Sequence, residues 1–509
     1  MCAFRWIFGF TSLVCILVLS ACEPEKTRIR WSPDGSQALV VLPDGLHLCD
    51  PEGQLSPLLV AGANSAEWLA DSRRLVVLRT EPLTSWAQVS KLIAEPTRRK
   101  IIDLATQVRT AAMSYQGDWE QFGDTLKDKI DEQTLGAYFT SIALYLHDQD
   151  DAALRAKLGA QWEKAIGAAR VDSDVLQTYE INQAAAKPGP VLLQWAVERS
   201  AKLLRVSPTG QYVAVSYLAT AYAIDHPVPY PACGLGVVAL DGSESFRPVS
   251  ELTTMFVDWT PDGRYLVFGR TDYSDQEKQA GHDNHEDRAR LVAITKHKIT
   301  DLEGTPPENI QNEDLAGVLY SPALRVRCLK DGRILFSTSE MHLPATPNKM
   351  PKEQSIFALD PAKPETVTNL IPPKALASTG GLADYFELSP DAKSVSLLSP
   401  QGHVLILTLA TGEVTACQKD TIQVQTDNGD LNPRIVPQWR TSNQLTYVRL
   451  VENPKPGQPV AEVVLRNATT GDCKSLSAKW PAASVRGFLI APPPAATAAA
   501  TATAPATQQ

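Results

Sequence analysis

A short motif that recurs along the chain constrains its fold more than any other feature of the sequence. Most copies contain a Trp or a Ser-Pro pair, then an Asp-Gly or related turn, then a run of apolar and β-branched residues. Clear copies are Trp31–Gly35 before Ala38–Leu42 and Asp258–Gly263 before Tyr265–Phe268. Asp and Gly allow tight turns and β-branched residues favour strands, so each copy predicts a β-hairpin.

Seven copies can be aligned, and the apolar segments after them predict a repeat of four strands. The aligned residues are at positions 31, 68, 206, 259, 328, 388 and 439. Most hairpins are succeeded by a second pair of apolar segments, such as Val404–Leu409 and Val414–Gln418. Four antiparallel strands per repeat make one blade of a β-propeller. We therefore predict an all-β, seven-bladed β-propeller, within a range of six to eight blades, that ends near residue 490.

The motif resembles the TolB-like, WD-type propeller repeat of bacterial envelope proteins. The resemblance rests on Trp31-Ser-Pro-Asp-Gly35, Val206-Ser-Pro-Thr-Gly210 and Leu388-Ser-Pro-Asp391, and it covers residues 27–490 apart from one wide gap. It implies a propeller that belongs to the bacterial envelope. Repeats of this kind specify a fold and not an activity, so the resemblance assigns no catalytic residue.

The wide gap, between the copies at 68 and 206, holds a segment with helical periodicity. From Ser85 to Arg170 the spacing of apolar residues changes from two to about 3.6. The residues on its two apolar faces are Ile101, Leu104, Ala105, Val108, Ala112 and Tyr115, then Leu154, Leu158, Trp162 and Ile166. Asp148 or Asp150 is expected to cap the second of these helices. We predict a helical insertion at 85–170 in the second blade, between propeller segments 27–84 and 171–490.

The N-terminus has the pattern of a secretory signal. A short basic start, Met1–Arg5, precedes the apolar run Trp6–Leu19, whose length is typical of a signal-peptide core. The next residues, Leu19-Ser20-Ala21-Cys22, resemble the bacterial lipobox. An uncleaved membrane anchor with an incidental cysteine is the alternative interpretation.

The lipobox resemblance implies how the chain is processed. Cleavage between Ala21 and Cys22 would remove a signal peptide at 1–21, and Cys22 would carry the acyl groups (palmitate among them) that anchor the protein. Residues 22–26 would then form a linker to the first blade. Glu23 stands where retention in the inner membrane would use Asp. The resemblance therefore implies the outer membrane, on its periplasmic face.

Composition argues against a nucleic-acid partner and against a membrane-spanning segment after the N-terminal one. The chain has 48 Lys and Arg against 57 Asp and Glu, a net charge of −9. A nucleic-acid-binding protein usually needs a basic face, so no nucleic-acid partner is expected. No later segment approaches the roughly 20 apolar residues that span a bilayer. The Ala/Thr/Pro-rich tail at 491–509 is predicted to be disordered.

A few groups of residues are candidates for chemistry, each with a structural alternative. His282 and His285 lie among acidic residues and could hold a divalent metal, or they could belong to a solvated hairpin. The aromatic residues of one long connection could form a ligand wall or pack among prolines; they are Tyr217, Tyr222, His226 and Tyr230. His47 and His403 fall within strand patterns and are expected to be structural.

The remaining cysteines are an odd set without a Cys-x-x-Cys pair. They are Cys49, Cys233, Cys328, Cys417 and Cys473. We expect buried strand residues, although one disulfide is compatible with an oxidising compartment. The chain has neither a Gly-x-Ser-x-Gly nucleophile elbow nor a phosphate-binding loop. No catalytic residue and no cofactor are therefore predicted.

These features favour a non-catalytic, lipid-anchored envelope propeller that binds another protein as a scaffold or adaptor. The longest connections join the second and third strands of blades, and they mark the expected binding face. The alternative is a propeller hydrolase or lyase acting on envelope glycan or peptide, through His282 and His285 or through carboxylates in the central channel. A glycan-binding or small-molecule-binding module is a third possibility.

Overall fold

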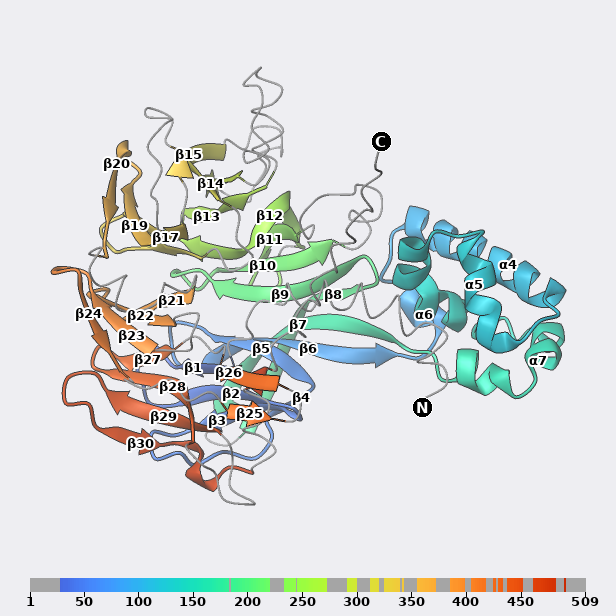
Figure 1. Cartoon of the computed structure of the whole chain (residues 1–509), viewed down its shortest axis with the longest axis horizontal. Coiled ribbons are helices and arrows are strands. Elements are labelled where there is room, and N and C mark those ends of the chain that lie inside the picture. The colour runs from blue at the N-terminus through green and yellow to red at the C-terminus, as the bar shows by residue number, and fades with distance from the viewer. Residues whose placement is uncertain are drawn as a thin grey trace, which may run out of the picture.

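Antiparallel β-sheets make up most of the molecule, and one group of helices lies beside them (Figure 1). The structure is a computed structural model that describes residues 28–182, 185–219, 233–243, 245–271, 291–299, 312–319, 325–338, 341–342, 355–371, 385–398, 404–417, 424–426, 429–433, 437–451, 461–481 and 489–490. The predicted all-β class with antiparallel sheets is confirmed.

Five of the sheets contain four strands that pair in the order in which they occur along the chain. The first two are β1 (Ile29–Trp31), β2 (Ala38–Leu42), β3 (Gly45–Cys49) and β4 (Val60–Ala61), then β5 (Ala63–Trp68), β6 (Arg74–Leu83), β7 (Val171–Asn182) and β8 (Ala185–Ala196). The third contains β16 (Val326–Cys328), β17 (Ile334–Thr338), β19 (Ser355–Asp360) and β20 (Lys363–Asn369), and the fourth contains β21 (Tyr385–Leu388), β22 (Ser394–Leu398), β23 (Val404–Thr408) and β24 (Glu413–Ala416). The fifth contains β27 (Gln438–Thr441), β28 (Gln444–Leu450), β29 (Ala461–Asn467) and β30 (Cys473–Ser475). A short helix, η5 (Ser477–Lys479), follows β30.

A larger sheet joins two such sets through one long strand. Its strands are β9 (Arg199–Val206), β10 (Tyr212–Ala219), β11 (Cys233–Ala239), β12 (Arg247–Trp259), β13 (Tyr265–Arg270), β14 (Leu291–Lys298), β15 (Asn312–Leu319) and β18 (Met341–His342). The first half of β12 pairs with β11 and its last residues pair with β13, so β12 closes one set and opens the next. A small sheet contains β25 (Val424–Thr426), β26 (Gly429–Pro433) and β31 (Leu489–Ile490).

The first strands of successive sets contact one another in a closed series, which defines a β-propeller. The series runs β1, β5, β9, β12 and β16, and an ion pair between Arg327 and Glu387 links β16 to β21. From β21 it returns through β27 to β1. Apolar residues of neighbouring sheets are buried together, as where Val40 of β2 lies in one cluster with Val463 of β29. This closure brings the two ends of the described chain into one core.

The motif turns form because their polar side chains satisfy the backbone locally. Asp34 accepts hydrogen bonds from the Ser32 hydroxyl at 2.5 Å and from the backbone N–H of Ser36 at 3.0 Å. These bonds hold the pKa of Asp34 below its usual value, against the opposing effect of burial. The next residue, Gly35, has a φ of +69°, a conformation that glycine adopts without steric cost. The turn is thus encoded by residues that are adjacent in the sequence.

The helices lie between β6 and β7 and have a core of their own. They are α3 (Trp86–Val89), α4 (Glu95–Ser114), η1 (Trp119–Gln121), α5 (Phe122–Lys127), α6 (Glu132–Asp148), α7 (Ala152–Leu158) and η2 (Glu163–Gly167). We call them the helical unit, and Figure 1 shows them on one side of the sheets, beyond β6 and β7. Leu83, Val171 and Ala196 at the strand ends pack into their core. Among the helices that the structure describes, none combines the length and apolarity of a membrane span.

The expected cap of the last α-helix was wrong by a few residues. Asp151 is the N-cap of α7 and accepts from the backbone N–H groups of Ala153 and Leu154, both at 3.0 Å. Asp148 instead ends α6, and its carboxylate accepts from the backbone N–H of Trp86 at 2.7 Å. Asp150 has a φ of +47° and pairs with Arg155. A tertiary contact with α3 therefore engages the aspartate that local spacing had assigned to α7.

Because β6 and β7 pair up to the base of the helical unit, the helices can be removed from the chain and replaced by a turn. Leu83 pairs with Val171 at the very end of the ladder, so residues 84–170 can be replaced by a two-residue Asn-Gly turn. We expect this variant, with Leu83→Thr and Val171→Thr to remove newly exposed apolar surface, to unfold cooperatively on heating and to lose helical circular dichroism.

The same excision without the two threonine substitutions is the matched control. It should fold but remain less soluble, because Leu83 and Val171 pack against the helical core in the intact chain. A variant with both threonines that shows no cooperative transition would mean that the sheets need the helices to fold.

Candidate functional site

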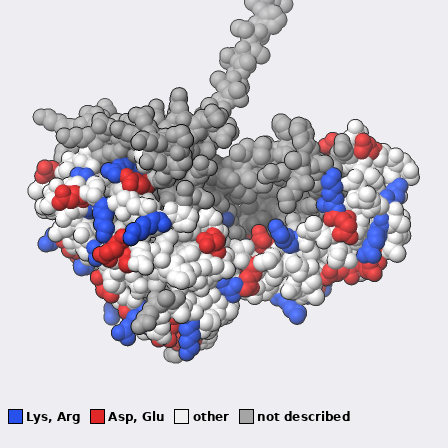
Figure 2. All heavy atoms as spheres, turned by 90° about the horizontal axis from the view of Figure 1, so that it is seen from below, with Lys and Arg blue, Asp and Glu red and all other residues white. Residues whose placement is uncertain are grey.

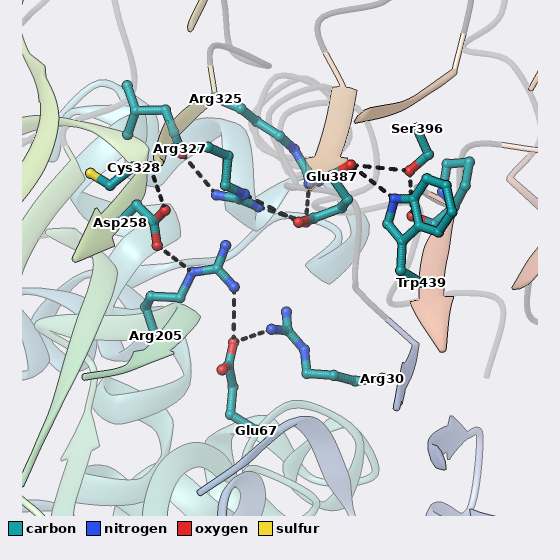
Figure 3. A network of polar contacts seen from close by, with 12 residues as sticks. Arg30, Glu67, Arg205, Asp258, Arg325, Arg327, Cys328, Glu387, Ser396 and Trp439 are labelled. Atoms are coloured by element: carbon teal, nitrogen blue, oxygen red, sulfur yellow. Dashed lines mark hydrogen bonds and ion pairs between the residues drawn. The ribbon is translucent and has the colours of Figure 1, made fainter. Parts of the chain in front are cut away.

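One register position on the first strand of every set carries a polar residue, and Figure 3 shows six of these side chains pointing toward one another. The residues at this position are Arg30, Glu67, Arg205, Asp258, Arg327, Glu387 and Gln438. Each lies immediately before the motif position occupied by Trp in the clearest copies. We call them the axial ring. Their charges alternate in sign through six members, and the seventh member is neutral.

The first half of the axial ring is a chain of ion pairs. The Arg30 Nη1 atom lies 2.8 Å from Glu67 Oε1, and Arg205 Nη1 lies 3.7 Å from the same oxygen. Arg205 Nε then lies 3.2 Å from Asp258 Oδ1. Asp258 uses its other oxygen to accept the backbone N–H of Cys328 at 2.9 Å. Each carboxylate here is therefore engaged by neighbours on both sides.

The second half of the axial ring concentrates positive charge on one carboxylate. Arg327 binds Glu387 through Nη2 at 2.5 Å and through Nε at 3.1 Å, a bidentate pair. Arg325, two residues earlier, adds its Nη1 at 2.8 Å from the same carboxylate. The Arg325 guanidinium also lies 4.8 Å from the ring centre of Phe256, and its side chain is only 2% exposed. Glu387 thus holds two buried guanidinium groups.

Burial and neighbouring charges oppose each other at these residues. Burial alone would raise the pKa of Glu387, but Arg327, Arg325 and Arg205 outweigh it and hold that pKa well below its usual range. Burial also disfavours charge on Arg205, yet Asp258 and Glu67 raise its pKa above the ordinary arginine value. At Arg30 burial prevails over the attraction of Glu67, so its pKa is lowered.

The chemical consequence is that Glu387 is a poor general acid near neutral pH. A general acid near neutral pH needs a raised pKa, and the pKa of Glu387 is shifted in the opposite direction. Glu67 and Asp258 are likewise occupied by guanidinium groups. The described residues of the axial ring therefore form a charge network that stabilises the centre of the propeller.

Three of the motif tryptophans bind their own first strand to the first strand before it. The indole N–H of Trp68 donates to the backbone carbonyl of Arg30 at 3.0 Å, and that of Trp259 donates to the carbonyl of Arg205 at 2.8 Å. Trp439 repeats the contact with Glu387 at 3.1 Å (Figure 3). The acceptor is each time the ring residue of the preceding strand, so the motif itself builds the axial ring.

Most residues that the sequence singled out lie outside the part of the chain that the structure describes. They are His282, His285, Ala21, Cys22 and His403, together with Tyr222, His226 and Tyr230. Tyr217 is described and is fully buried beside Trp195 and Phe246. Among the described residues, no three His, Cys, Asp or Glu side chains are grouped as metal ligands would be.

The surroundings of His47 and of the buried cysteines indicate structural roles. His47 is buried, with Nδ1 3.0 Å from the Ser56 carbonyl oxygen and Nε2 3.1 Å from Asp44. Cys49, Cys233 and Cys417 are buried and not disulfide-bonded. The expectation of a buried strand residue is wrong for Cys473, which is exposed at the edge strand β30. Its position on an outer strand leaves one side open to solvent.

The axial ring was missed at the sequence level, although a signal for it was present. The residue before the aligned motif position is charged in six of the seven copies, and its sign alternates along the chain. Recognising this requires that all copies, including the degraded ones without Trp, be aligned first. The contacts that give the pattern its meaning are between strands roughly 40 to 60 residues apart or more, so local spacing does not reveal them.

Fold and site together define the class of this protein as a β-propeller with a buried, charge-paired centre. No family model and no curated protein matches the sequence. An oligogalacturonate lyase from Vibrio parahaemolyticus is similar in structure, with 8% identity, a TM-score of 0.44, and coverage of 87% of this chain and 89% of the lyase.

Two further solved structures show the range of the similarities. A putative TolB from Agrobacterium tumefaciens has 13% identity and a TM-score of 0.32, over 56% of this chain and 83% of that one. A puromycin-hydrolyzing peptidase from Mycobacterium tuberculosis has 14% identity and a TM-score of 0.38, over 60% of this chain but only 43% of the peptidase. Since these scores are below 0.5, the propeller is defined by the strand topology of this chain itself.

Removing the carboxylate that two arginines share should be strongly destabilising. We expect Glu387→Gln to lower the free energy of unfolding at pH 7 by about 3–5 kcal/mol, because Arg325 and Arg327 are left buried without a counter-charge. The exposed Glu413→Gln is the matched control and should change it by less than about 0.5 kcal/mol. Denaturant titration measures both values.

The stability difference between wild type and Glu387→Gln should also depend on pH. The pKa of Glu387 is lower in the folded state than in the unfolded chain, so its stabilising effect is complete above about pH 5 and is lost as pH falls toward the folded pKa. The stability difference between wild type and Glu387→Gln should therefore shrink below about pH 4.3. A difference that does not change down to about pH 3 would contradict this assignment.

The neutral member of the axial ring should not tolerate either sign of charge. Gln438 is buried on β27, between the strand of Glu387 and the strand of Arg30. We expect Gln438→Glu and Gln438→Lys each to cost at least about 2 kcal/mol, because either charge meets a like charge on one side. Gln438→Met, similar in size and uncharged, should cost less than both in denaturant unfolding. A charged variant as stable as the Met variant would show that this position need not be neutral.

Proposed function

We propose that this chain is a lipid-anchored scaffold protein of the bacterial envelope that binds another envelope protein and catalyses no reaction. In this proposal the propeller has seven blades, with the helical unit inserted in the second, and Cys22 carries acyl groups that hold the protein on the periplasmic face of the outer membrane. The hydrolase or lyase alternative would need an acid–base site.

The observation that carries the proposal is the state of the axial carboxylates. A propeller enzyme that used its central channel would need carboxylates free to exchange protons. Here Glu67, Asp258 and Glu387 are each bound by guanidinium groups. This favours a structural centre and moves function to the rim, where connections between strands vary without disturbing the blades.

One face of the propeller is the best candidate for the binding surface. Leu83 at the end of β6 and Ala219 at the end of β10 lie at the end of the blades where first strands begin. The helical unit emerges at this face. Arg28 lies there too, because its carbonyl accepts the backbone N–H of Val41 at 2.8 Å. Six residues separate Arg28 from Cys22, at most about 21 Å of extended chain, so an acylated Cys22 would keep this face near the membrane.

The charge distribution supports a protein partner. On the face that Figure 2 shows, acidic and basic side chains are interspersed over the described residues, both on the sheets and on the helical unit. A nucleic-acid-binding surface would instead gather basic residues on one face. Mixed charges around a rigid scaffold are the usual setting for a specific protein–protein contact.

In-cell photocrosslinking of the tagged, full-length protein tests the proposal. We expect a photoreactive amino acid in place of exposed Asp103 on α4 to capture one dominant protein, because α4 belongs to the helical unit on the proposed binding face. The same residue in place of Lys393, on the opposite, turn-bearing face, is the matched control and should capture little. Mass spectrometry of the extracted protein should find an acylated N-terminal peptide that begins at Cys22.

Two results would contradict the proposal in different ways. Capture from position 393 and not from 103 would place the partner on the wrong face. An intact N-terminus without acyl groups would remove the anchor while leaving the scaffold proposal standing.

A further inference from the structure

Three aromatic rings enclose the guanidinium group of Arg199. Trp195 is the last residue but one of β8, Tyr217 lies on β10, and Phe246 precedes β12; we call these three residues the aromatic cage. The guanidinium carbon lies 5.5, 5.2 and 5.4 Å from their respective ring centres. The rings stand edge to face, with centres 5.1 Å apart for Trp195 and Tyr217 and 4.7 Å apart for Trp195 and Phe246. Aromatic faces arranged around one point attract a cation there.

Two glycines on β11 make room for this arrangement. A Cβ at Gly234 would collide with the ring of Tyr217, and a Cβ at Gly236 would collide with the ring of Phe246. Both glycines are buried and lie two residues apart, so they face the same side of the strand. The absence of side chains at these two positions therefore lets two of the three rings pack directly against the backbone of β11.

The Arg199 guanidinium group, which occupies the aromatic cage, is held loosely on its solvent-facing side. The Arg199 side chain is 33% exposed, and its carboxylate partner Glu251, 3.6 Å away, is 45% exposed. Water screens an ion pair of this kind, so it adds little to the hold on Arg199. The buried hydroxyl of Tyr217 has no hydrogen-bond partner among the described residues. With Arg199 inside, the cage thus satisfies the charge but leaves a polar group unpaired.

The segment that carries Arg199 also holds the helical unit. The backbone N–H of Glu198 donates to the carbonyl of Ala196 at 2.7 Å, which closes a three-residue turn around Val197. Val197 has a φ of +64°, a strained conformation for a β-branched residue. The carboxylate oxygens of Glu198 lie 3.3 Å from the backbone N–H of Ala94, the N-cap of α4. One strained turn therefore connects the cage with the helices.

We propose that the aromatic cage is a binding site for a basic side chain, Arg or Lys, of the partner protein, and that Arg199 is its internal competitor. That the ligand belongs to a partner protein rests on the proposed function, whereas the presence of a cation-binding site does not rest on it. Glu251 at the rim favours a cation that bears N–H donors over a quaternary ammonium group. Displacement of Arg199 would release the turn at Val197 and with it the contact to α4.

Small probes test the site on the purified protein. Arg199→Ala should bind N-acetyl-arginine-N-methylamide at least tenfold more tightly than wild type does, because the competing side chain is gone. The citrulline analogue has the same shape without charge and should bind at least tenfold more weakly to that variant. Adding Phe246→Ala should abolish the gain. Isothermal titration calorimetry measures all of these affinities, and Arg199→Gln takes the place of Arg199→Ala if the alanine variant does not fold.

Equal affinity of wild type and both Arg199 variants for the arginine probe would overturn the site, as would equal binding of the citrulline analogue. Tetramethylammonium binding as tight as that of the arginine probe would overturn the assignment to a basic side chain. The proposed function fails separately: a cage that binds the arginine probe, in a protein that captures no partner from position 103, would keep the site and remove the scaffold.

Discussion

The structure depends on the odd number of members in the axial ring. The charges of the axial ring cannot alternate in sign throughout, because its described members are odd in number and the strand of the last, Gln438, contacts the strand of the first, Arg30. The chain has three pairs of opposite charge and one neutral residue, Gln438. Between the sheet that carries Gln438 and the first sheet, other contacts take over. Arg440 donates to the carbonyl of Gly35 at 2.9 Å and lies over the ring of Trp31, whose indole N–H donates to Thr446 at 2.8 Å.

A charge-paired centre limits what the rest of the molecule can do. Buried charges are costly to desolvate, and the cost is offset only while each keeps its partner. A ligand that drew Glu387 or Asp258 away would leave arginines unpaired in the core. The charge pairs of the axial ring therefore favour keeping the first strands in their present arrangement. This is why the helical unit and the aromatic cage, both at the face where first strands begin, are the elements to which function can be assigned.

The sequence predicted the features that are decided locally and missed those that are decided between blades. Hairpins such as that of Ala38–Leu42 were predictable because Asp34 and Gly35 satisfy the turn within a few residues. The axial ring joins Arg30 to Glu67 and Arg327 to Glu387 across separate repeats, so no local pattern contains it. The error at Asp148 has the same origin, because its carboxylate binds Trp86 in a distant helix.

The coupling between cage and helices is a consequence of how the two are joined. β6 and β7 remain paired up to Leu83 and Val171, so the base of the helical unit is fixed to its sheet. Its second attachment, through Glu198 and Ala94, depends on the strained turn that Arg199 holds in place from the cage. Strain persists only where surrounding contacts enforce it. A cation that takes the place of Arg199 removes one of those contacts, and the helices then keep their attachment at Leu83 and Val171 and the packing of Ala196 against their core.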